Sequence, residues 1–372
     1  MPSPTSARGR AETEDSSHPL RVVIVAPRIQ HLIGGQEVQA DLLLRLWHHD
    51  PDVRASYLAS NPELPRWLES IRYLRTLARF PLYLARLAAG LRHADVVHIF
   101  STSFSGFLLS VAPAYCMARV FRKKTLINYR SGLAESHLRA SSFARNILRS
   151  SDKVLVPSSY LVDVFREFQI ASDAIPNVVD TNLFSFRPRS PLRPLLLCSR
   201  NLEKCYGIDL VLRAFAGVQN TFPEARLFLL GEGSEENAIR HVIADLHLNG
   251  VEMPGRVPRE RIGEFYKKAD ILINASRVDN MPVSILEAFA AGLPVVSSNA
   301  GGIPAIVRHE ETGLLSDKED WKQLAANIMR LLGDPALARR LTENAYRQSL
   351  SYHWDAVRGQ WLRVYGELLE RR

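Results

Sequence analysis

Two periodicities of apolar and polar residues alternate along the chain and predict strands and helices in turn. The run RVVIVAP, Arg21 to Pro27, is apolar over the length of a buried strand. A glycine-bearing loop follows, and then QEVQADLLLRLWHH carries apolar residues at helical spacing. Further apolar runs begin at Val96, Thr125 and Val154, separated by stretches with helical character. This alternation is typical of a parallel sheet whose strands are joined by crossover helices.

A second series of the same kind follows the stretch SFRPRSPLRP, whose Pro, Ser and Arg residues predict an interdomain linker. The new apolar runs lie in LLLCSR, ARLFLLGEG, VEMPGRV, ADILINAS and LPVVSSN. We therefore predict an α/β protein with two Rossmann-like domains, residues 20–185 and 186–350, that face each other across a cleft. Ligands of open α/β sheets bind beyond the carboxyl ends of the strands, so both sets of loops would line this cleft.

Residues 351–372 predict one long helix with an apolar face. Trp354, Val357, Trp361, Val364 and Leu368 follow one another at spacings of three and four. A helix face with so many large apolar side chains has to pack against another part of the protein. The helix either docks on its own domain or crosses back to the first, and the spacing leaves both open.

Composition limits the class of protein. A chain of 372 residues with 46% hydrophobic and 23% charged residues suits two globular cores. Three cysteines without paired spacing predict neither a disulfide framework nor a structural zinc site, which fits a reducing, cytoplasmic compartment. Residues 1–19 are polar and predict a disordered tail rather than a signal peptide. The longest apolar stretch, Phe104 to Val120, contains Ser, Pro and Arg and predicts a buried helix rather than a membrane span.

The most informative stretch for chemistry runs from Ala275 to Pro304. A strand ends before the polar loop that carries Asp279, and Pro282 suits the first turn of the helix that contains Glu287. A helix start offers free N–H groups to a diphosphate, and a nearby carboxylate can accept hydrogen bonds from sugar hydroxyls. For an isolated pair of acids, a helix cap and a solvated helix residue would be the simpler interpretation.

The wider stretch resembles the signature of the retaining glycosyltransferases of family 4, which have the GT-B fold. Two acidic residues with seven residues between them are followed by A-x-A-x-G-x-P-V-V and G-G. Asp279 stands where the first Glu is usual, and Glu287 matches the second. The other matching residues are Ala288, Ala290, Gly292, Pro294, Val295, Val296, Gly301 and Gly302. By this resemblance Glu287 binds the donor ribose, Asp279 lies near the transferred sugar or the phosphates, and Pro282, Val283 and Ser284 contact the donor.

Two cations follow the first strand of the second domain. Arg200 and Lys204 in SRNLEKCYG could stabilise a leaving diphosphate. The family has an Arg here and a Lys about five residues later, before Gly, whereas this chain has Lys four residues on. We assign both residues to catalysis, with a solvated loop lysine as the alternative for Lys204.

Two further segments resemble donor-binding parts of the family. Gly34 and Gly35 in LIGGQEVQA match its G-G-x-E opening and would bring backbone N–H groups to the diphosphate, although two glycines before a helix also form an ordinary turn. Arg256 and Val257 in VEMPGRVPRERI match the segment that lines the nucleobase pocket, with an exposed loop residue as the alternative for Arg256.

Arg130 in INYRSGLAE stands where the family carries a His followed by Gly near the reacting sugar. An arginine stays protonated and cannot act as a base, but it could orient an acceptor or a phosphate, so we include it among the catalytic candidates. The only Asp-x-Asp spacing is Asp50 to Asp52, which encloses Pro51 and predicts a turn. We therefore expect no metal site and no cofactor apart from the nucleotide-sugar co-substrate.

The segment Leu64 to His93 mixes large apolar residues with six arginines. A basic amphipathic helix can lie on an anionic membrane and would bring the protein to a lipid-linked acceptor. The alternative is an ordinary crossover helix with a solvated basic face. The protein would accordingly be cytoplasmic, either free or peripheral on the inner membrane face.

The resemblance predicts a retaining transfer of a hexose-type sugar from a UDP- or GDP-sugar to a hydroxyl of a glycan, lipid-linked or small-molecule acceptor. Two alternatives are a non-catalytic sugar-nucleotide-binding homologue or partner subunit, which Asp279, Arg130 and Ala305 suggest, and a sugar-nucleotide epimerase. The net charge of +8 favours an anionic partner, but scattered basic residues without an aromatic recognition motif do not favour nucleic acid.

Overall fold

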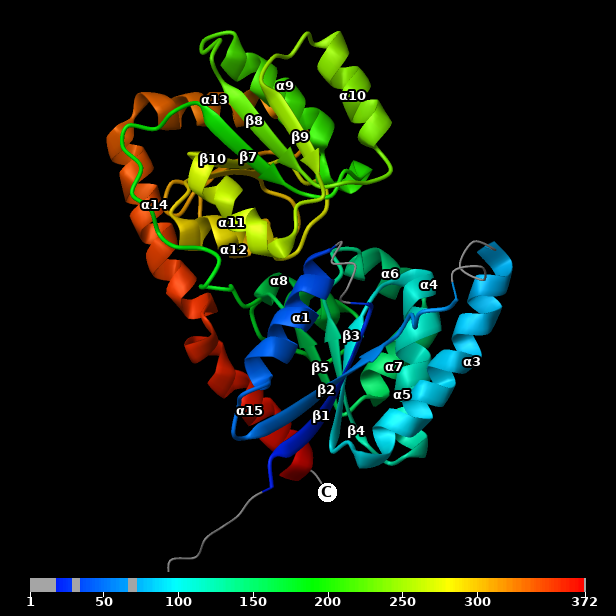
Figure 1. Cartoon of the computed structure of the whole chain (residues 1–372). Helices are drawn as coiled ribbons and strands as arrows, with labels where there is room; N and C mark the ends of the chain where they lie inside the picture. Colours follow the sequence, from blue (N-terminus) through cyan, green and yellow to red (C-terminus); the bar gives the residue numbers. More distant parts are fainter. Residues whose placement is uncertain (1–17, 29–33, 66–71, 371–372) are drawn as a thin grey trace, which may run out of the picture.

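The computed structural model describes residues 18–28, 34–65 and 72–370, and these form two α/β domains, one above the other in Figure 1. Each domain is built on a six-stranded parallel sheet. The result confirms the predicted fold class of two Rossmann-like domains. Most of the tail predicted for residues 1–19 lies outside the described residues.

The first sheet has the strand order β2-β1-β3-β4-β5-β6. Its strands are β1 (Leu20–Ala26), β2 (Val53–Ala59), β3 (Val96–Ser101), β4 (Lys124–Tyr129), β5 (Lys153–Val156) and β6 (Asp173–Ala174). Its helices are α1 (Gly35–Trp47), α3 (Arg72–Gly90), α4 (Phe104–Gly106), α5 (Ala112–Val120), α6 (Ala134–Ala140), α7 (Ser142–Ser150) and α8 (Ser159–Glu167), with short helical turns at Leu91–His93 and Phe107–Val111.

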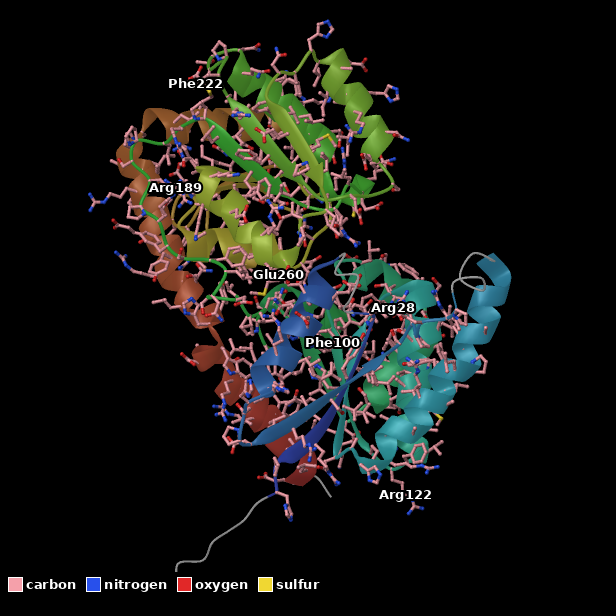
Figure 2. All side chains as sticks on the ribbon, in the orientation of Figure 1. Arg28, Phe100, Arg122, Arg189, Phe222 and Glu260 are labelled. Atoms are coloured by element: carbon pink, nitrogen blue, oxygen red, sulfur yellow. The ribbon has the colours of Figure 1, made fainter. Side chains whose placement is uncertain are left out.

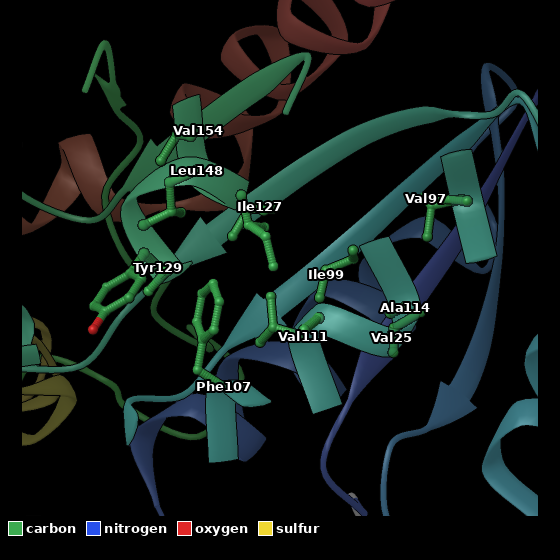
Figure 3. Close-up of a cluster of buried hydrophobic side chains, with 14 of the residues drawn as sticks. Val25, Val97, Ile99, Phe107, Val111, Ala114, Ile127, Tyr129, Leu148 and Val154 are labelled. Carbon is green, nitrogen blue, oxygen red and sulfur yellow. The ribbon is translucent and has the colours of Figure 1, made fainter. Parts of the chain in front are cut away.

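Helices cover both faces of this sheet, which explains why its strands are continuous apolar runs. Val23 and Val25 of β1 point into a core formed with α3, α5 and α7, part of which Figure 3 shows. Val22 and Ile24 point to the opposite face, where α1 packs. The stretch Phe104–Val120 buries only one face, because Phe104, Leu108, Leu109 and Val120 stay exposed.

The second sheet has the order β12-β11-β10-β7-β8-β9, the strand order of dinucleotide-binding domains. Its strands are β7 (Leu195–Ser199), β8 (Arg226–Leu230), β9 (Val251–Gly255), β10 (Ile271–Asn274), β11 (Val295–Ser298) and β12 (Leu314–Ser316). Its helices are α9 (Ile208–Gln219), α10 (Glu236–Asp245), α11 (Arg259–Lys268), α12 (Val283–Ala291), α13 (Trp321–Gly333) and α14 (Pro335–Ser349), with short turns at Lys204–Tyr206, Ile303–Ala305 and Leu350–Tyr352.

The basic linker between the sheets is tied to the second domain. Arg187 and Arg193 both bind the buried Asp270 carboxylate, at 2.7 and 2.8 Å. Arg189, labelled in Figure 2, is 8% exposed and donates to the backbone carbonyls of Tyr266 and Gly292, at 2.7 Å each. The arginines of the linker thus fix it against the second domain.

The last helix, α15 (Trp354–Glu370), leaves the second domain and packs on the first sheet, as its red ribbon in Figure 1 shows. Trp361 and Tyr365 lie in the same core as Val22 and Phe100. At its start, Arg358 binds Asp50 and Asp52, each at 2.6 Å. The apolar face therefore joins the two domains by covering a sheet face that α1 alone leaves open.

α3 is the crossover helix between β2 and β3, and its Tyr83 and Leu87 are buried in the first core. The segment Leu64–His93, for which we weighed membrane contact, includes residues 66–71, which lie outside the described residues. Among the described residues, no helix is both long and apolar enough to cross a bilayer. Peripheral membrane contact stays a prediction.

A buried histidine joins α15 to the first sheet and gives the domain a pH-dependent stability. His98 of β3 hydrogen bonds through its two ring nitrogens to Tyr365 and Asn128, at 2.9 and 3.1 Å. Burial, reinforced by the positive charge of Arg130, lowers the pKa of His98 to about 3 from 6.5. Between pH 6.5 and 3 the imidazole of His98 therefore binds a proton in the unfolded chain but not in the folded chain. The free energy of unfolding decreases as the pH falls through this range.

We expect this histidine alone to lower the free energy of unfolding by up to about 1.4 kcal/mol per pH unit between pH 6 and 4. Urea denaturation of the wild type and His98→Gln at pH 7, 6, 5 and 4 measures it. The stability advantage of the wild type over His98→Gln should shrink as the pH falls. A difference that does not change with pH would contradict the pKa shift.

Candidate functional site

The candidate site lies where the chain reverses its direction of winding in the two sheets. In the second sheet this point is between β7 and β10, and in the first it is between β1 and β3. Ligands of such sheets bind beyond the carboxyl ends of the strands at this point. Arg200 follows β7, and the loop with Asp279 follows β10, so residues far apart in sequence meet there.

Two connected pockets occupy the cleft. The pocket of about 890 Å³, here called the C-terminal pocket, is lined by Ser199, Glu232 and other residues mainly of the second domain. The pocket of about 1040 Å³, here called the interdomain pocket, is lined by Thr102, Asn177 and other residues of both domains. Residues that line both pockets, and so mark their junction, are Gly34, Gly35, Arg200, Tyr206 and Val283.

Arg200 and Asp279 form a mostly buried ion pair at this junction. Burial alone would lower the pKa of Arg200, but the Asp279 carboxylate, together with weaker contributions from Tyr206 and two cysteines, raises it above its usual value. The Tyr206 ring lies 4.0 Å from the Arg200 guanidinium carbon, and Ser276 donates to Asp279 at 3.1 Å. The guanidinium is thus held at one place and stays protonated, while its buried Nε has no hydrogen-bond partner within residues 18–28, 34–65 and 72–370.

The G-G pair of the signature shapes the loop that carries Asp279. Gly301 has a φ of +52°, and a Cβ on it would lie 2.1 Å from the carbonyl oxygen of Asp279. Gly302 donates its N–H to the same carbonyl at 3.1 Å, and a Cβ there would lie 2.3 Å from the Asn280 carbonyl oxygen. Only glycines let the loop after β11 lie against this backbone.

Glu287 is 2% exposed in the buried helix α12 and lines the C-terminal pocket. Its carboxylate accepts hydrogen bonds from Arg259 and, at 2.7 Å, from the hydroxyl of Tyr266. Both partners come from α11. Each carboxylate oxygen has two lone pairs, so both can accept a further hydrogen bond from a ligand.

Two helix N-termini converge at the junction. α12 starts at Val283 after Pro282, and α1 starts at Gly35 after Gly34. Proline and glycine have no side-chain acceptor, so neither N-cap residue can occupy the first N–H groups of its helix. A Cβ on Gly35 would lie 3.3 Å from the Val283 side chain, so the two helix starts almost touch. Both positive dipole ends therefore act on the same space, which favours an anion.

The start of α1 holds one carboxylate of its own. Glu37 lines the interdomain pocket and bends back towards Gly34, whose Cβ position lies 2.8 Å from the carboxylate. Burial raises the pKa of Glu37, and hydrogen bonds from the N–H groups of Glu37 and Gly34 offset part of that rise.

The remaining predicted residues divide between the pockets and the surface. Arg256 and Val257 line the C-terminal pocket, where Arg256 pairs with Glu232 at 2.8 Å and is 38% exposed. Arg130 lines the interdomain pocket. Pro282 lines the interdomain pocket and Ser284 the C-terminal one. Lys204 is exposed and lines neither pocket, so the structure does not bring it to the other candidates.

Arg259, Tyr266 and Tyr206 line or support the pockets and were missed in the sequence. Arg259 and Tyr266 lie on an ordinary amphipathic helix, and nothing in their spacing signals that they meet Glu287. Across residues 18–28, 34–65 and 72–370, no group of three or more His, Cys, Asp or Glu side chains could hold a metal ion.

Two protein-family models match the chain: Glycosyltransferase Family 4 over residues 20–183 and Glycosyl transferases group 1 over residues 182–348. An exopolysaccharide phosphotransferase of Streptomyces coelicolor is 36% identical over 203 residues, 54% of this chain and 21% of that protein. A D-inositol 3-phosphate glycosyltransferase of Acidothermus cellulolyticus is 30% identical over 233 residues, 57% of this chain and 51% of that protein. The matches thus span about a fifth to a half of these relatives' length.

Among solved structures, Anabaena HepE in complex with UDP-glucose superposes with a TM-score of 0.74 and 17% sequence identity. The match covers 94% of this chain and 100% of that one. At this identity the likeness concerns the fold, which is the GT-B arrangement of two facing Rossmann-like domains.

Proposed function

The chain belongs to the glycosyltransferases of group 1 and family 4, and from this membership we propose that it transfers a sugar from a nucleoside diphosphate sugar to an acceptor hydroxyl. The sugar is of hexose type, the donor is a UDP- or GDP-sugar, and the transfer retains the anomeric configuration. The acceptor is a glycan, a lipid-linked sugar or a small molecule. The UDP-glucose bound to the structural relative HepE supports a donor of this class.

One observation carries the assignment of the donor site: among the described residues, three buried polar atoms of residues that line the C-terminal pocket find no hydrogen-bond partner. These are Nε of Arg200, Nε of Arg259 and Oγ of Ser284. Folded proteins pair nearly all of their buried polar groups, so such atoms grouped around one pocket favour a polar ligand. A nucleotide supplies acceptors for both arginines and for the serine.

The donor fits the pockets in one direction. The nucleoside would occupy the C-terminal pocket, with its ribose hydroxyls donating to Glu287 and its base beside Arg256 and Val257. The diphosphate would lie at the junction, between the starts of α1 and α12 and within reach of Arg200. The sugar would then point into the interdomain pocket, where the acceptor enters.

This placement suggests how the transfer proceeds. The bond from the anomeric carbon to the diphosphate oxygen breaks, and a bond to the acceptor oxygen forms on the same face of the sugar. The acceptor proton passes to the leaving diphosphate, so no side chain has to act as the base. Because the acceptor oxygen itself attacks the anomeric carbon, no side chain has to act as a nucleophile. Arg200 and the two helix starts stabilise the negative charge that grows on the diphosphate. Asp279 acts as a positioning residue because it fixes the Arg200 guanidinium.

Thermal-shift measurements with nucleotides test the proposal. We expect UDP or GDP, and their sugars, to raise the melting temperature by about 5 °C at a concentration about a hundred times Kd. The corresponding monophosphate should give a smaller shift, because it cannot reach the junction, and ADP is the base control. If no nucleoside diphosphate raises the melting temperature, the donor site is wrong.

Turnover separates the proposal from its alternatives. Release of nucleoside diphosphate that depends on an acceptor extract supports a transferase. Donor binding without turnover with any acceptor would support a non-catalytic homologue, and conversion of the donor without an acceptor would support an epimerase.

A further inference from the structure

Arg130 is held rigidly in the interdomain pocket. It is the first residue after β4, and its guanidinium donates to the Oδ1 of Asn177. The Nδ2 of the same asparagine donates to the Met281 carbonyl at 2.8 Å, which joins the contact to the second domain. The guanidinium carbon lies 5.3 Å from the centre of the Phe100 ring, whose position Figure 2 labels. These contacts fix one edge and one face of the guanidinium.

Arg130 differs from the other arginines of the site because it has no counter-charge. Arg200 pairs with Asp279, Arg259 with Glu287, and Arg256 with Glu232. In the part of the chain that the structure describes, no carboxylate forms an ion pair with Arg130, and Asn177 is its one hydrogen-bond partner. Burial lowers the pKa of Arg130 to about 9, which still leaves it protonated at neutral pH.

A partly buried cation without a counter-charge is costly, and such a cation in a pocket favours an anionic ligand that compensates it. Two further groups in the same pocket support a ligand there. The Oγ1 of Thr102 and the Nδ2 of Asn280 are buried and have no hydrogen-bond partner in the described part of the chain. Thr102 and Arg130 each follow the last pair of the β3–β4 register, Ser101 and Tyr129, and both line the interdomain pocket.

The donor diphosphate does not account for this cation. The junction of the two pockets, where we place the diphosphate, is lined by Arg200 and the two helix starts. Arg130 is not at this junction, because it lines only the interdomain pocket. The anion that Arg130 compensates therefore belongs to the part of the substrates that occupies the interdomain pocket.

Building on the proposed function, we propose that Arg130 binds a carboxylate or phosphate group carried by the acceptor or by the transferred sugar. The enzyme is thereby selective for an acidic substrate. Arg130 is a specificity-determining residue, since it supplies a fixed positive charge for that group, and the Thr102 hydroxyl and the Asn280 amide are placed to hydrogen bond to it.

Binding of inorganic phosphate to the nucleotide-saturated protein is the first test. With saturating UDP or GDP, whichever stabilises the protein, phosphate should raise the melting temperature above that in potassium chloride of equal ionic strength. Arg130→Gln should weaken this effect at least about tenfold in apparent Kd, and Arg130→Lys should retain part of it. The matched control is Arg139→Gln, which removes an exposed arginine paired with Glu135 and should leave the phosphate effect unchanged.

Substrate pairs show which molecule carries the anion. A preference of about tenfold or more in kcat/KM for acidic over neutral acceptors, lost in Arg130→Gln, assigns the group to the acceptor. The same preference for a UDP- or GDP-hexuronate over the matching hexose donor assigns it to the transferred sugar. Equal rates within both pairs, or a phosphate effect of the same size in wild type and Arg130→Gln, would overturn the inference.

The shift by UDP or GDP alone keeps this test separate from that of the proposed function. It should be the same in the wild type and Arg130→Gln, because the donor pocket does not include Arg130. A normal nucleotide shift without any phosphate effect contradicts only the role of Arg130. Absence of the nucleotide shift in the wild type contradicts the donor site itself.

Discussion

Replacing Arg200 by methionine should lower kcat for sugar transfer by about a thousandfold, with a much smaller change in KM for the donor. The guanidinium lies where the charge of the leaving diphosphate would grow, and its ion pair with Asp279 holds it there before the reaction starts. A group that acts mainly on the developing charge contributes more to the transition state than to the ground state. Release of UDP or GDP under saturating donor and acceptor measures the effect.

The control for Arg200→Met has to account for the lost ion pair. The single variant leaves the mostly buried Asp279 carboxylate without its ion-pair partner, which lowers the stability of the folded protein. The double variant Arg200→Met/Asp279→Asn removes both charges and should be as inactive but more stable than the single variant. Arg240→Met, which breaks an exposed pair with Glu236, should retain wild-type activity. Activity of Arg200→Met within about tenfold of the wild type would contradict the proposed role.

The alternation of apolar runs predicted both sheets because parallel strands covered on both faces are continuously apolar. All six residues of β3 and all four of β11 are buried, as that pattern requires. The docking of α15 could not be predicted in the same way. Its apolar spacing defines a face but not the surface that receives it, and that surface depends on Trp47, His98 and the Asp50 carboxylate of another domain.

The proximity of candidate residues at strand ends could be predicted from the sequence, because the sheet topology brings these strand ends together. Arg200 and Asp279 each follow a strand at the reversal point of the second sheet, so the positions of β7 and β10 alone bring them together. Their functional roles remain predictions.

The hydrogen-bond partners that helices and loops supply to the site residues could not be predicted from the sequence. The contact of Arg259 with Glu287 depends on how α11 packs against α12, and that of Arg130 with Asn177 depends on a loop between the domains. Lys204 is the reverse case, in which the motif predicted a contact that the structure does not show. Its position in the motif indicated a phosphate contact, but in the turn Lys204–Tyr206 its side chain is exposed to solvent.

Replacing Glu287 by glutamine should weaken donor binding by about 10- to 100-fold in Kd, which corresponds to the roughly 1.5–3 kcal/mol of hydrogen bonds to a charged group. Arg259 and Tyr266 orient the carboxylate, and Glu287 lines the pocket that we assign to the nucleoside. Glutamine keeps the shape of the side chain but offers one neutral oxygen to two ribose hydroxyls. Calorimetric titration with UDP, GDP and their sugars measures the loss.

Two further variants separate ribose binding from support of the pocket. Tyr266→Phe removes one hydrogen bond that orients the carboxylate but leaves both carboxylate oxygens available to the ribose, so it should cost only about fivefold in Kd. Glu264→Gln removes an exposed carboxylate of α11 that lies 3.4 Å from Arg261, and it should bind the donor as the wild type does.

The 2′-deoxy nucleotide provides the decisive comparison, because it lacks one of the hydroxyls from which Glu287 would accept a hydrogen bond. It should bind more weakly than the ribonucleotide to the wild type but about equally to Glu287→Gln, whereas an undiminished preference in the variant would remove Glu287 from the ribose site.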